Sequence, residues 1–398
     1  MKRKKKLKWK HIAGILKFLI TIIPAKIASI FIKDLWLVQE DDNEARDNGY
    51  WMFKYIRENH PEQKCYYVLN KTSPDYEKVA KLGKIIKPHS FKHWWHYIIA
   101  SKVISSQTGG KPCPAFVNKM ENLGLFKTKT YFLQHGITVN DVGWLYHKFM
   151  KVKMFLTTTS QEDAFIKEKF GHPEQVVQYL GFPRFDNLHN DITDKDMILV
   201  MPSWRNYINN AGVVLDGTGS VGSQNFLDSD YFKKWSEFIN SKQLDEFLIA
   251  NDKTLYFYPH RNMQPFIDHF STSSKRVVIS KRANEDVQNL LRKCSMIITD
   301  YSSVIFDVLY QNKPVITYQF DEESFRAGQY AKGYFDYHTN PMIHHTNDLN
   351  GVFKHLNQLK KNNFKCGKDE LNEIHSFFSL RDNQNCKRVY EFIKQDKK

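Results

Sequence analysis

The chain has 398 residues, of which 41% are hydrophobic and 14% aromatic. This composition is far from that of disordered proteins, and the length exceeds that of a single small binding module, so two or three folded domains are expected. Lysine and arginine outnumber aspartate and glutamate by 58 to 43, which indicates an anionic partner.

The five cysteines are odd in number and include no Cys-x-x-Cys pair. This pattern argues against a disulfide framework and against a zinc site, and it predicts reduced thiols in a cytosolic protein.

The positive charge is concentrated at the N-terminus, where seven of the first ten residues are lysine or arginine. An apolar stretch over residues 12–32 follows, but Lys17, Pro24 and Lys26 interrupt it, which argues against a membrane span. We expect two short amphipathic helices, re-aimed at the proline, that lie on an anionic membrane surface. An internal helix of the first lobe and a single span are the alternatives. The residues expected at the membrane are Lys4, Lys5, Lys10, Lys17 and Phe18.

Two series of short apolar runs alternate with helical stretches. The first series occupies residues 66–69, 103–106, 131–134, 154–158 and 176–180, and the second 197–201, 255–258, 277–280, 296–299 and 315–318. Nearly continuous apolar runs are typical of parallel strands covered by helices on both faces. The predicted fold is therefore α/β, with two Rossmann-like lobes whose parallel sheets face an interlobe cleft. The expected boundaries are 1–38 for the basic tail and membrane-surface helices, 39–192 for the first lobe and 193–398 for the second.

Several predicted strands end in polar groups suited to phosphate chemistry. His135 follows one strand and is placed to accept a proton from a hydroxyl, with a purely structural histidine as the alternative. His260 and Arg261 end another strand and are suited to neutralising a transferring phosphoryl group. The turn at 299–303 offers hydroxyls and backbone N–H groups to an anion, and simple N-capping by its serines is the competing interpretation.

A fourth strand end carries Arg184 and Asp186, for which a phosphate contact and a structural ion pair are both open. Gly217, Gly219 and Gly222 have the spacing of a dinucleotide fingerprint, but no strand precedes them, so we expect a surface loop. The histidines at 89, 93 and 96 share a helical face with interleaved aromatics, which favours an interfacial surface over a metal site. His344 and His345 are expected in a loop. Nucleic-acid binding is disfavoured because the densest positive charge lies beside an apolar stretch.

In combination these segments resemble the CDP-glycerol glycerophosphotransferase family, the primases and polymerases of teichoic acid synthesis. Residues 43–49 resemble the opening segment of that family. The matching elements follow the family's order over roughly residues 40 to 340, and they are Gln134-His-Gly136, Gly181-Phe-Pro-Arg-Phe-Asp186, Pro202-Ser-Trp-Arg205, Pro259-His260, Thr299-Asp-Tyr-Ser-Ser303 and Gly333-Tyr-Phe-Asp336.

The resemblance implies a GT-B architecture and a peripheral protein at the cytoplasmic face of the membrane. It implies transfer of glycerol phosphate, or a related alditol phosphate, from CDP-glycerol to a lipid-linked teichoic acid or capsule precursor, with release of CMP. His135 then becomes the candidate general base in an acceptor lobe, and His260 the group that stabilises the diphosphate or protonates CMP. The donor-binding candidates are Thr299, Asp300, Ser302, Ser303, Arg261, Arg184, Asp186, Arg205 and Asp336.

No cofactor is firmly implied, although a divalent cation is compatible with the reaction. A GT-B glycosyltransferase that uses a nucleotide sugar is the alternative function. The residues after His-Gly read Ile-Thr-Val-Asn, where many members of the family have Thr-Pro and a basic stretch. Together with the short N-terminal region, this favours a primase-like or single-unit transferase over a long-chain polymerase.

Overall fold

The computed structural model describes residues 9–107, 110–209, 226–282 and 285–396. The chain forms two compact units, of which the first comprises Met1–Ile137, Gly143–Asn187 and Leu380–Lys398, and the second Thr138–Val142 and Leu188–Ser379. Lys4, Lys5 and the glycines at 217–222 lie outside the described residues, and so does the side chain of Lys10.

The first unit is built on a parallel sheet with the strand order β3-β2-β1-β4-β5-β6-β7. Because the order reverses beside the first strand, the sheet is doubly wound, with a topological switch point between β1 and β4. The strands are β1 (Trp36–Gln39), β2 (Cys65–Val68), β3 (Ile85–Ile86), β4 (Lys102–Ser105), β5 (Thr130–Phe132), β6 (Met154–Thr157) and β7 (Val177–Tyr179).

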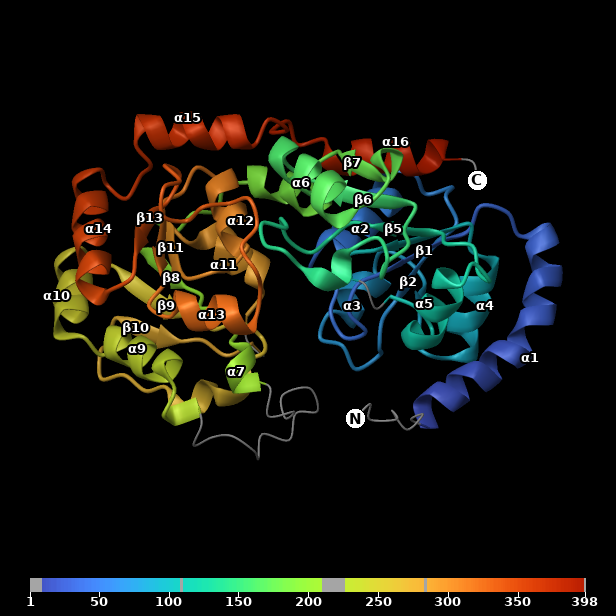
Figure 1. Cartoon of the computed structure of the whole chain (residues 1–398), viewed down its shortest axis with the longest axis horizontal. Coiled ribbons are helices and arrows are strands. Elements are labelled where there is room, and N and C mark those ends of the chain that lie inside the picture. Colours follow the sequence, from blue (N-terminus) through green and yellow to red (C-terminus); the bar gives the residue numbers. More distant parts are fainter. Residues whose placement is uncertain (1–8, 108–109, 210–225, 283–284, 397–398) are drawn as a thin grey trace. The chain divides into compact units, whose positions relative to one another are not determined.

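Helices cover both faces of this sheet (Figure 1). On one face Leu37 and Val103 pack in a common core with Trp94 and Val117 from two of the helices. On the other face the ring of Trp36 contacts Tyr390 near the C-terminus. The helices of the unit are α1 (Trp9–Phe31), α2 (Asn48–Asn59), α3 (Tyr76–Ala80), α4 (Phe91–Ile99), α5 (Pro114–Asn122), α6 (Ser160–Phe170) and α16 (Asn385–Gln395).

Helix α1 is continuous across Pro24, so the prediction of two helices re-aimed at the proline is wrong. Of the described helices it is the one whose length and composition would allow a membrane crossing, and 22% of its most apolar window is buried. Figure 1 shows it lying along α4 and α5. Phe18, predicted at the membrane, instead faces inward and contacts Trp94, Phe116 and Phe126. Lys17 donates a hydrogen bond to the carbonyl of His89, 2.8 Å away.

The second unit repeats the same architecture, with the strand order β10-β9-β8-β11-β12-β13 in a parallel sheet. Its strands are β8 (Met197–Val200), β9 (Thr254–Phe257), β10 (Val277–Ile279), β11 (Met296–Thr299), β12 (Val315–Tyr318) and β13 (His344–Thr346). Its helices are α7 (Asn206–Asn209), α9 (Asp230–Ile239), α10 (Lys242–Ala250), α11 (Val287–Lys293), α12 (Val304–Tyr310), α13 (Glu322–Gly328), α14 (Leu349–Lys361) and α15 (Lys368–Phe377). Side chains of α9, α10 and α14 form one core with the sheet.

All ten strands expected from the apolar runs are present, each within a few residues of its predicted position. Three further strands, β1, β3 and β13, were not predicted, and the expectation of a loop at His344 and His345 is wrong because both lie in β13. The α/β fold with two parallel sheets is confirmed.

The C-terminus departs from the predicted boundaries, because α16 belongs to the first unit. One Asp186 oxygen accepts hydrogen bonds from the backbone and side-chain nitrogens of Asn385, and the other accepts one from the backbone of Cys386, at 2.8 to 2.9 Å. The carboxylate therefore satisfies N–H groups at the start of α16, where a helix stabilises negative charge. Gly181 is required beside it, since its φ is +83° and a Cβ would meet the side chain of Asn385.

We predict that Asp186→Ala lowers the free energy of unfolding by about 1–2 kcal/mol, because the first turn of α16 loses its acceptor. Urea unfolding of the full chain measures this change. The matched control is Asp382→Ala, which removes an exposed carboxylate that precedes α16 and pairs with Arg388 of that helix. It should cost less than about 1 kcal/mol. Equal losses in the two variants would contradict the capping role.

Candidate functional site

His135 lies on an unusual turn after β5 in the first unit. Its side chain is exposed, and the preceding residue, Gln134, is 2% exposed and has a φ of +57°. A non-glycine residue in this region costs about 1–2 kcal/mol, so the surrounding structure must hold it there. The side chain of Gln134 donates to the carbonyl of Leu156 and to the carboxylate of Glu162, which is fully buried.

Asn48, at the start of α2, holds the backbone of the same turn. Its amide nitrogen donates to the carbonyls of Leu133 and Gln134 at 3.1 and 2.8 Å, and its amide oxygen accepts from the backbone of Arg184 at 3.1 Å. Asn48 is fully buried. One side chain therefore joins the turn before His135 to the segment after β7, and the imidazole is presented by a rigid support.

Arg184 is 4% exposed and lies over the rings of Phe182 and Phe185. One guanidinium nitrogen is 3.1 Å from the carboxylate of Asp47, the N-cap residue of α2. Arg184 therefore contributes to the packing behind the His135 turn, and Asp186 holds α16. Neither arrangement tests the predicted contact with a donor phosphate.

In the second unit the predicted donor residues gather where β8, β9 and β11 end. The backbone N–H of His260 donates to the carbonyl of Pro202, and that of Ser203 donates to Asp300, both within 2.9 Å. Parallel strands bring their carboxyl ends to one edge of the sheet, and the reversal of strand order between β8 and β11 is a topological switch point, where open α/β sheets bind their ligands. Three loops that are far apart in sequence are thus fastened together.

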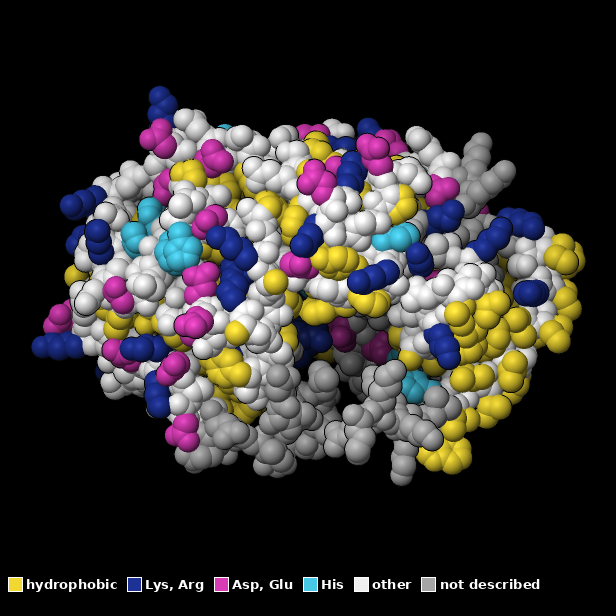
Figure 2. Space-filling view, viewed as in Figure 1, with side chains coloured by type: hydrophobic (Ala, Val, Ile, Leu, Met, Phe, Trp, Pro, Cys, Tyr) yellow, Lys and Arg dark blue, Asp and Glu magenta, His cyan; other side chains and the backbone are white. Residues whose placement is uncertain are grey.

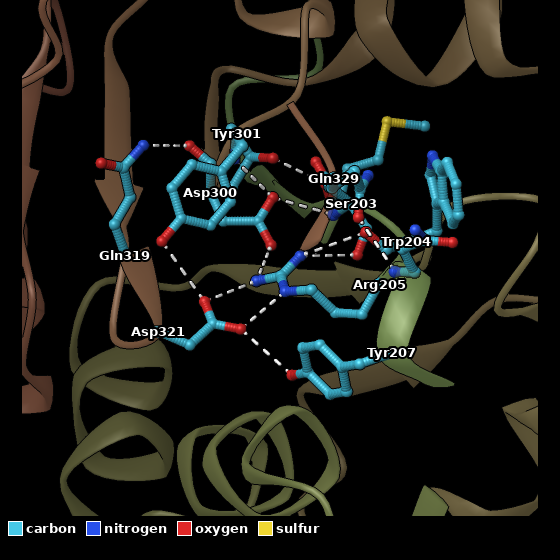
Figure 3. A network of polar contacts seen from close by, with 12 residues as sticks. Ser203, Trp204, Arg205, Tyr207, Asp300, Tyr301, Gln319, Asp321 and Gln329 are labelled. Carbon is cyan, nitrogen blue, oxygen red and sulfur yellow. Dashed lines mark hydrogen bonds and ion pairs between the residues drawn. The ribbon is translucent and has the colours of Figure 1, made fainter. Parts of the chain in front are cut away.

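Arg205 is the centre of the network in Figure 3. Its guanidinium is fully buried and contacts Asp300 at 2.8 Å and Asp321 at 2.7 and 3.0 Å. Burial alone would lower the pKa of Arg205, but the two carboxylates hold it above its ordinary value. A guanidinium so enclosed has a structural role. Arg205 can affect the predicted phosphate contacts only by holding the loops that carry them.

Two aromatic hydroxyls complete this network. Tyr207 and Tyr301 donate to opposite oxygens of Asp321 at 3.1 and 3.3 Å. Burial and the charge of Asp321 raise the pKa of both tyrosines, so they remain protonated donors. The ring of Tyr301 stacks on Phe325 with centroids 3.8 Å apart.

Thr299 and Asp300 are both fully buried. The Thr299 hydroxyl donates to the carbonyl of Met201 at 2.7 Å, and one Asp300 oxygen accepts from the backbone N–H groups of Ser203 and Tyr301. These side chains hold the loops after β8 and β11 against one another. Ser302 and Ser303 follow on the same turn and are partly exposed, and the Ser302 hydroxyl accepts a hydrogen bond from the backbone N–H of Val304 at 3.4 Å.

The ring of His260 is partly exposed and its Nδ1 accepts a hydrogen bond from the backbone N–H of Asn262 at 3.1 Å. The neutral imidazole therefore carries its proton on Nε2 and offers that proton as a donor. Arg261, the next residue, is exposed. His260 and Arg261, both predicted to contact phosphate, are thus accessible at the edge of the sheet.

Asp336 lies in a turn after α13, where it accepts from the backbone N–H of His338 and pairs with Lys332. The backbone hydrogen bond and the lysine lower the pKa of Asp336. Gly333, at the start of the same motif, lies so close to the backbone of Val139 that a Cβ would clash. The motif therefore fastens this turn to Thr138–Val142, the short segment of the second unit that follows His135 and Ile137 in the chain.

The histidines of α4 do not form the expected surface, because His93 is fully buried and accepts a hydrogen bond from the backbone of His89. Burial lowers the pKa of His93 to about 3, so it is a neutral core residue. Within the described ranges no group of three histidine, cysteine or acidic side chains is arranged to hold a metal ion.

Sequence reasoning missed three residues that organise these loops: Asn48, Asp321 and Tyr207. Asn48 lies in the segment that resembles the opening of the family, so only its role was missed. Asp321 and Tyr207 gave no local signal, because Arg205 and Tyr207 are each more than 100 positions away from Asp321 in sequence.

Two doubly wound parallel sheets, each with polar loops at its carboxyl edge, form the GT-B architecture. A model of the family described as CDP-Glycerol:Poly(glycerophosphate) glycerophosphotransferase matches residues 28–395, and the chain belongs to this family.

Curated relatives agree with this assignment. The chain is 30% identical over 368 residues to the minor teichoic acid biosynthesis protein GgaB of Bacillus subtilis strain 168, covering 91% of this chain and 40% of that protein. It is 23% identical over 318 residues to the teichoic acid poly(glycerol phosphate) polymerase of the same strain, covering 72% of this chain and 38% of the polymerase. The chain thus spans about 40% of the length of these relatives.

Solved structures share the fold. The wall teichoic acid polymerase TagF superposes with a TM-score of 0.66 at 16% identity, with 98% of each chain covered. A UDP-N-acetylglucosamine 2-epimerase from Listeria monocytogenes has a TM-score of 0.53 at 13% identity, covering 91% of this chain and 96% of the epimerase.

We predict that Asn48→Ala lowers the free energy of unfolding by about 2–4 kcal/mol, because two carbonyls and one N–H lose their partner in a buried site. Activity should fall in parallel at temperatures where the variant remains folded, since the turn before His135 loosens. Denaturant unfolding and turnover of the same preparations measure both effects. Asn59→Ala, an exposed change at the other end of α2, is the control and should alter neither quantity.

Proposed function

We propose that the chain transfers glycerol phosphate, or a related alditol phosphate, from CDP-glycerol to a hydroxyl of a lipid-linked teichoic acid or capsule precursor, releasing CMP. The observation that carries this proposal is the gathering of His260, Arg261, Ser302 and Ser303 where β9 and β11 end, in a chain of this family. These are neutral or cationic donors at the edge of a doubly wound sheet, which suits a diphosphate. One solved structure of TagF was obtained with CDPG, which supports a CDP-activated donor.

The proposed reaction is an in-line displacement at the phosphorus that bears glycerol. The acceptor oxygen forms a bond to this phosphorus, its proton passes to the His135 imidazole, and the bond from phosphorus to the CMP oxygen breaks. The Nε2–H of His260 donates to the departing phosphate, because its Nδ1 is occupied by the N–H of Asn262. The hydroxyls of Ser302 and Ser303 and the charge of Arg261 bind the remaining phosphate oxygens.

His135 is close along the chain to a segment of the second unit. His135 and Ile137 belong to the first unit, and Thr138, three residues after His135, belongs to the second. Three residues of extended chain reach at most about 11 Å. The imidazole therefore comes from a turn that is directly joined to the donor-binding unit.

Arg205, Thr299 and Asp300 receive a different role in this proposal from the one that sequence implied. Because all three are fully buried, they position the loops that carry the exposed donors. Asp336 and the Gly333 turn fasten the segment after His135 in the same way. We assign Arg184 and Asp186 a supporting role in the acceptor lobe as well, in place of the donor contact that the sequence implied.

A donor panel tests the reaction. Purified chain with CDP-glycerol, CDP-ribitol, a UDP-sugar or a GDP-sugar, and a detergent-solubilised lipid acceptor, should release CMP from a CDP-alditol. Release of UDP or GDP from a nucleotide sugar would instead establish the glycosyltransferase alternative.

We predict that His135→Ala and His260→Ala each reduce CMP release by about 10²- to 10⁴-fold, because each removes a proton-transfer group or a donor to the leaving phosphate. Thermal unfolding should be little changed, since neither ring is buried. The control is His375→Ala, which removes an exposed histidine on α15. Full activity in both His135→Ala and His260→Ala would refute the assignment.

We also propose that the chain attaches peripherally to the cytoplasmic face of the membrane through α1. One stripe of this helix packs on the protein, but the opposite stripe exposes Leu16, Leu19, Ile20, Ile23, Ile27 and Ile30 to between 54 and 69%. Figure 2 shows hydrophobic side chains gathered over α1 and its neighbours. An exposed apolar patch of this size beside a basic tail is suited to a lipid surface. A span would require both stripes to face lipid.

We predict that the double variant Ile23→Asp and Ile27→Asp reduces partition onto anionic vesicles at least 10-fold, because two charges enter the lipid-facing stripe. Vesicle sedimentation measures this. Ile249→Asp is a matched control, since this isoleucine of α10 is 57% exposed in the other unit. Unchanged partition of the double variant would contradict attachment through α1. Alkaline carbonate should extract the wild-type chain from membranes, whereas resistance to extraction would indicate a span.

A further inference from the structure

The first unit contains a cavity of about 230 Å³ that none of the proposed roles uses. It lies between the strands β4 and β5, the helix α5 and the segment around Trp144 and Phe149. All of its lining residues belong to the first unit. Its volume is sufficient for one sugar-sized group.

The charges in the buried part of this cavity cancel, and the third charged lining residue, Lys151, is partly exposed and lies 2.9 Å from His147 Nε2. Lys111 and Glu121 are each 6% exposed and form an ion pair with one another. Lys111 also donates to the side chain of Asn118 at 2.7 Å, and Glu121 accepts from the hydroxyl of Tyr97 at 3.3 Å. A buried pair with such partners presents no net charge to a ligand. The cavity is therefore better suited to a neutral polar group than to a phosphate.

Hydrogen-bonding capacity nevertheless remains in the lining. The buried hydroxyl oxygen of Thr130 has no hydrogen-bond partner in the described part of the chain. The ammonium of Lys111 has three protons, of which the contacts to Asn118 and Glu121 use two. A ligand hydroxyl both donates and accepts, so a hydroxyl-rich ligand would satisfy such groups.

Two aromatic side chains at the cavity remain unusually exposed, Trp144 by 53% and Phe149 by 56%. Their flat apolar faces, next to amide and hydroxyl groups, form the combination that a sugar ring requires: polar contacts for its hydroxyls and an apolar surface for its C–H face.

Helix α5 connects this cavity with the apolar surface of α1. Phe116 on α5 contacts Phe18 of α1, whereas Asn118 and Glu121, on the same helix, line the cavity. Leu123 and Leu125 follow α5 and are 61% and 68% exposed. A molecule with a polar head and an apolar tail could therefore place its head in the cavity and its tail beside α1.

The cavity also lies near the candidate base along the chain. Phe132 lines it at the end of β5, and His135 follows three residues later, a distance of about 10 Å in extended chain. An acceptor of one or two sugar units would span this distance.

We propose that this cavity binds the neutral saccharide head group of the lipid-linked acceptor and so determines which acceptor is used. This inference rests on the proposed transferase function. The polar atoms of Lys111, Asn118 and Thr130 contact the sugar hydroxyls, Trp144 covers one face of the ring, and the lipid extends toward α1.

A binding experiment without any donor tests the cavity independently of the reaction. Hexyl β-glucoside and hexyl phosphate serve as probes with the same tail and different heads, and calorimetry measures their affinity for the full chain. We expect the glucoside to bind more tightly, and Trp144→Ala to weaken it at least 10-fold. Phe31→Ala, which removes an apolar side chain of α1 that is 80% exposed, should change the affinity less than twofold. Because CDP-glycerol is absent, an error in the donor assignment leaves this result standing.

Two outcomes would overturn the proposal: equal losses in Trp144→Ala and Phe31→Ala, which would place binding on the apolar surface, or tighter binding of hexyl phosphate than of the glucoside. Gln107→Ala, a second change in the lining, should also weaken binding of the glucoside. Agreement between the two variants would show that the loss does not come from a folding defect in one of them. With the complete reaction, Trp144→Ala should raise the KM for the acceptor at least 10-fold and leave the KM for the donor unchanged. A fall in kcat with an unchanged acceptor KM would contradict a role in binding.

Discussion

The loops at the carboxyl edge of the second sheet depend on one buried cation. Arg205 is enclosed between Asp300 and Asp321, and the loops after β8, β11 and β12 meet at this guanidinium. Removing a charge from water costs several kcal/mol, which the paired carboxylates and additional hydrogen bonds must offset. The arrangement is therefore more important for geometry than for net stability. It fixes the backbone from which His260 and the serine turn extend.

In the first unit, neutral side chains fix the loop that carries His135. Asn48 and Gln134 hold a turn in a left-handed conformation, and the energy stored there is balanced by several buried hydrogen bonds. In both units the side chains that fix the loops are buried and the side chains proposed for chemistry are accessible. A polar residue in a shared motif can therefore have either role, and only its burial distinguishes them.

This distinction explains how far the sequence could be interpreted. The apolar runs located ten strands because a buried parallel strand is a local pattern. The strand β1 was missed because it directly follows the apolar helix α1. The edge strand β13 was missed because its two histidines give it no apolar run. Motif order identified the family, and polar strand ends indicated where we propose that the chemistry occurs. Local sequence could not show that Asp186 faces the start of α16 or that Arg205 has two partners, since those partners lie about 100 to 200 positions away.

In the membrane attachment that we propose, helix α1 connects the lipid surface with the acceptor site without being part of the reaction. The inner stripe of α1, made of small and aromatic residues, packs against α4 and α5. The helix therefore cannot rotate, and its outer apolar stripe faces water unless a lipid surface covers it. Because α5 packs against α1 and also lines the cavity, the attachment that we propose would fix the depth of the membrane surface relative to Asn118 and Glu121. A lipid-linked acceptor needs such a fixed depth, since its hydroxyl reaches the base only if the distance from the bilayer to the imidazole matches the length of its head group. In the proposed attachment, the packing of α1 on α5 would set that distance.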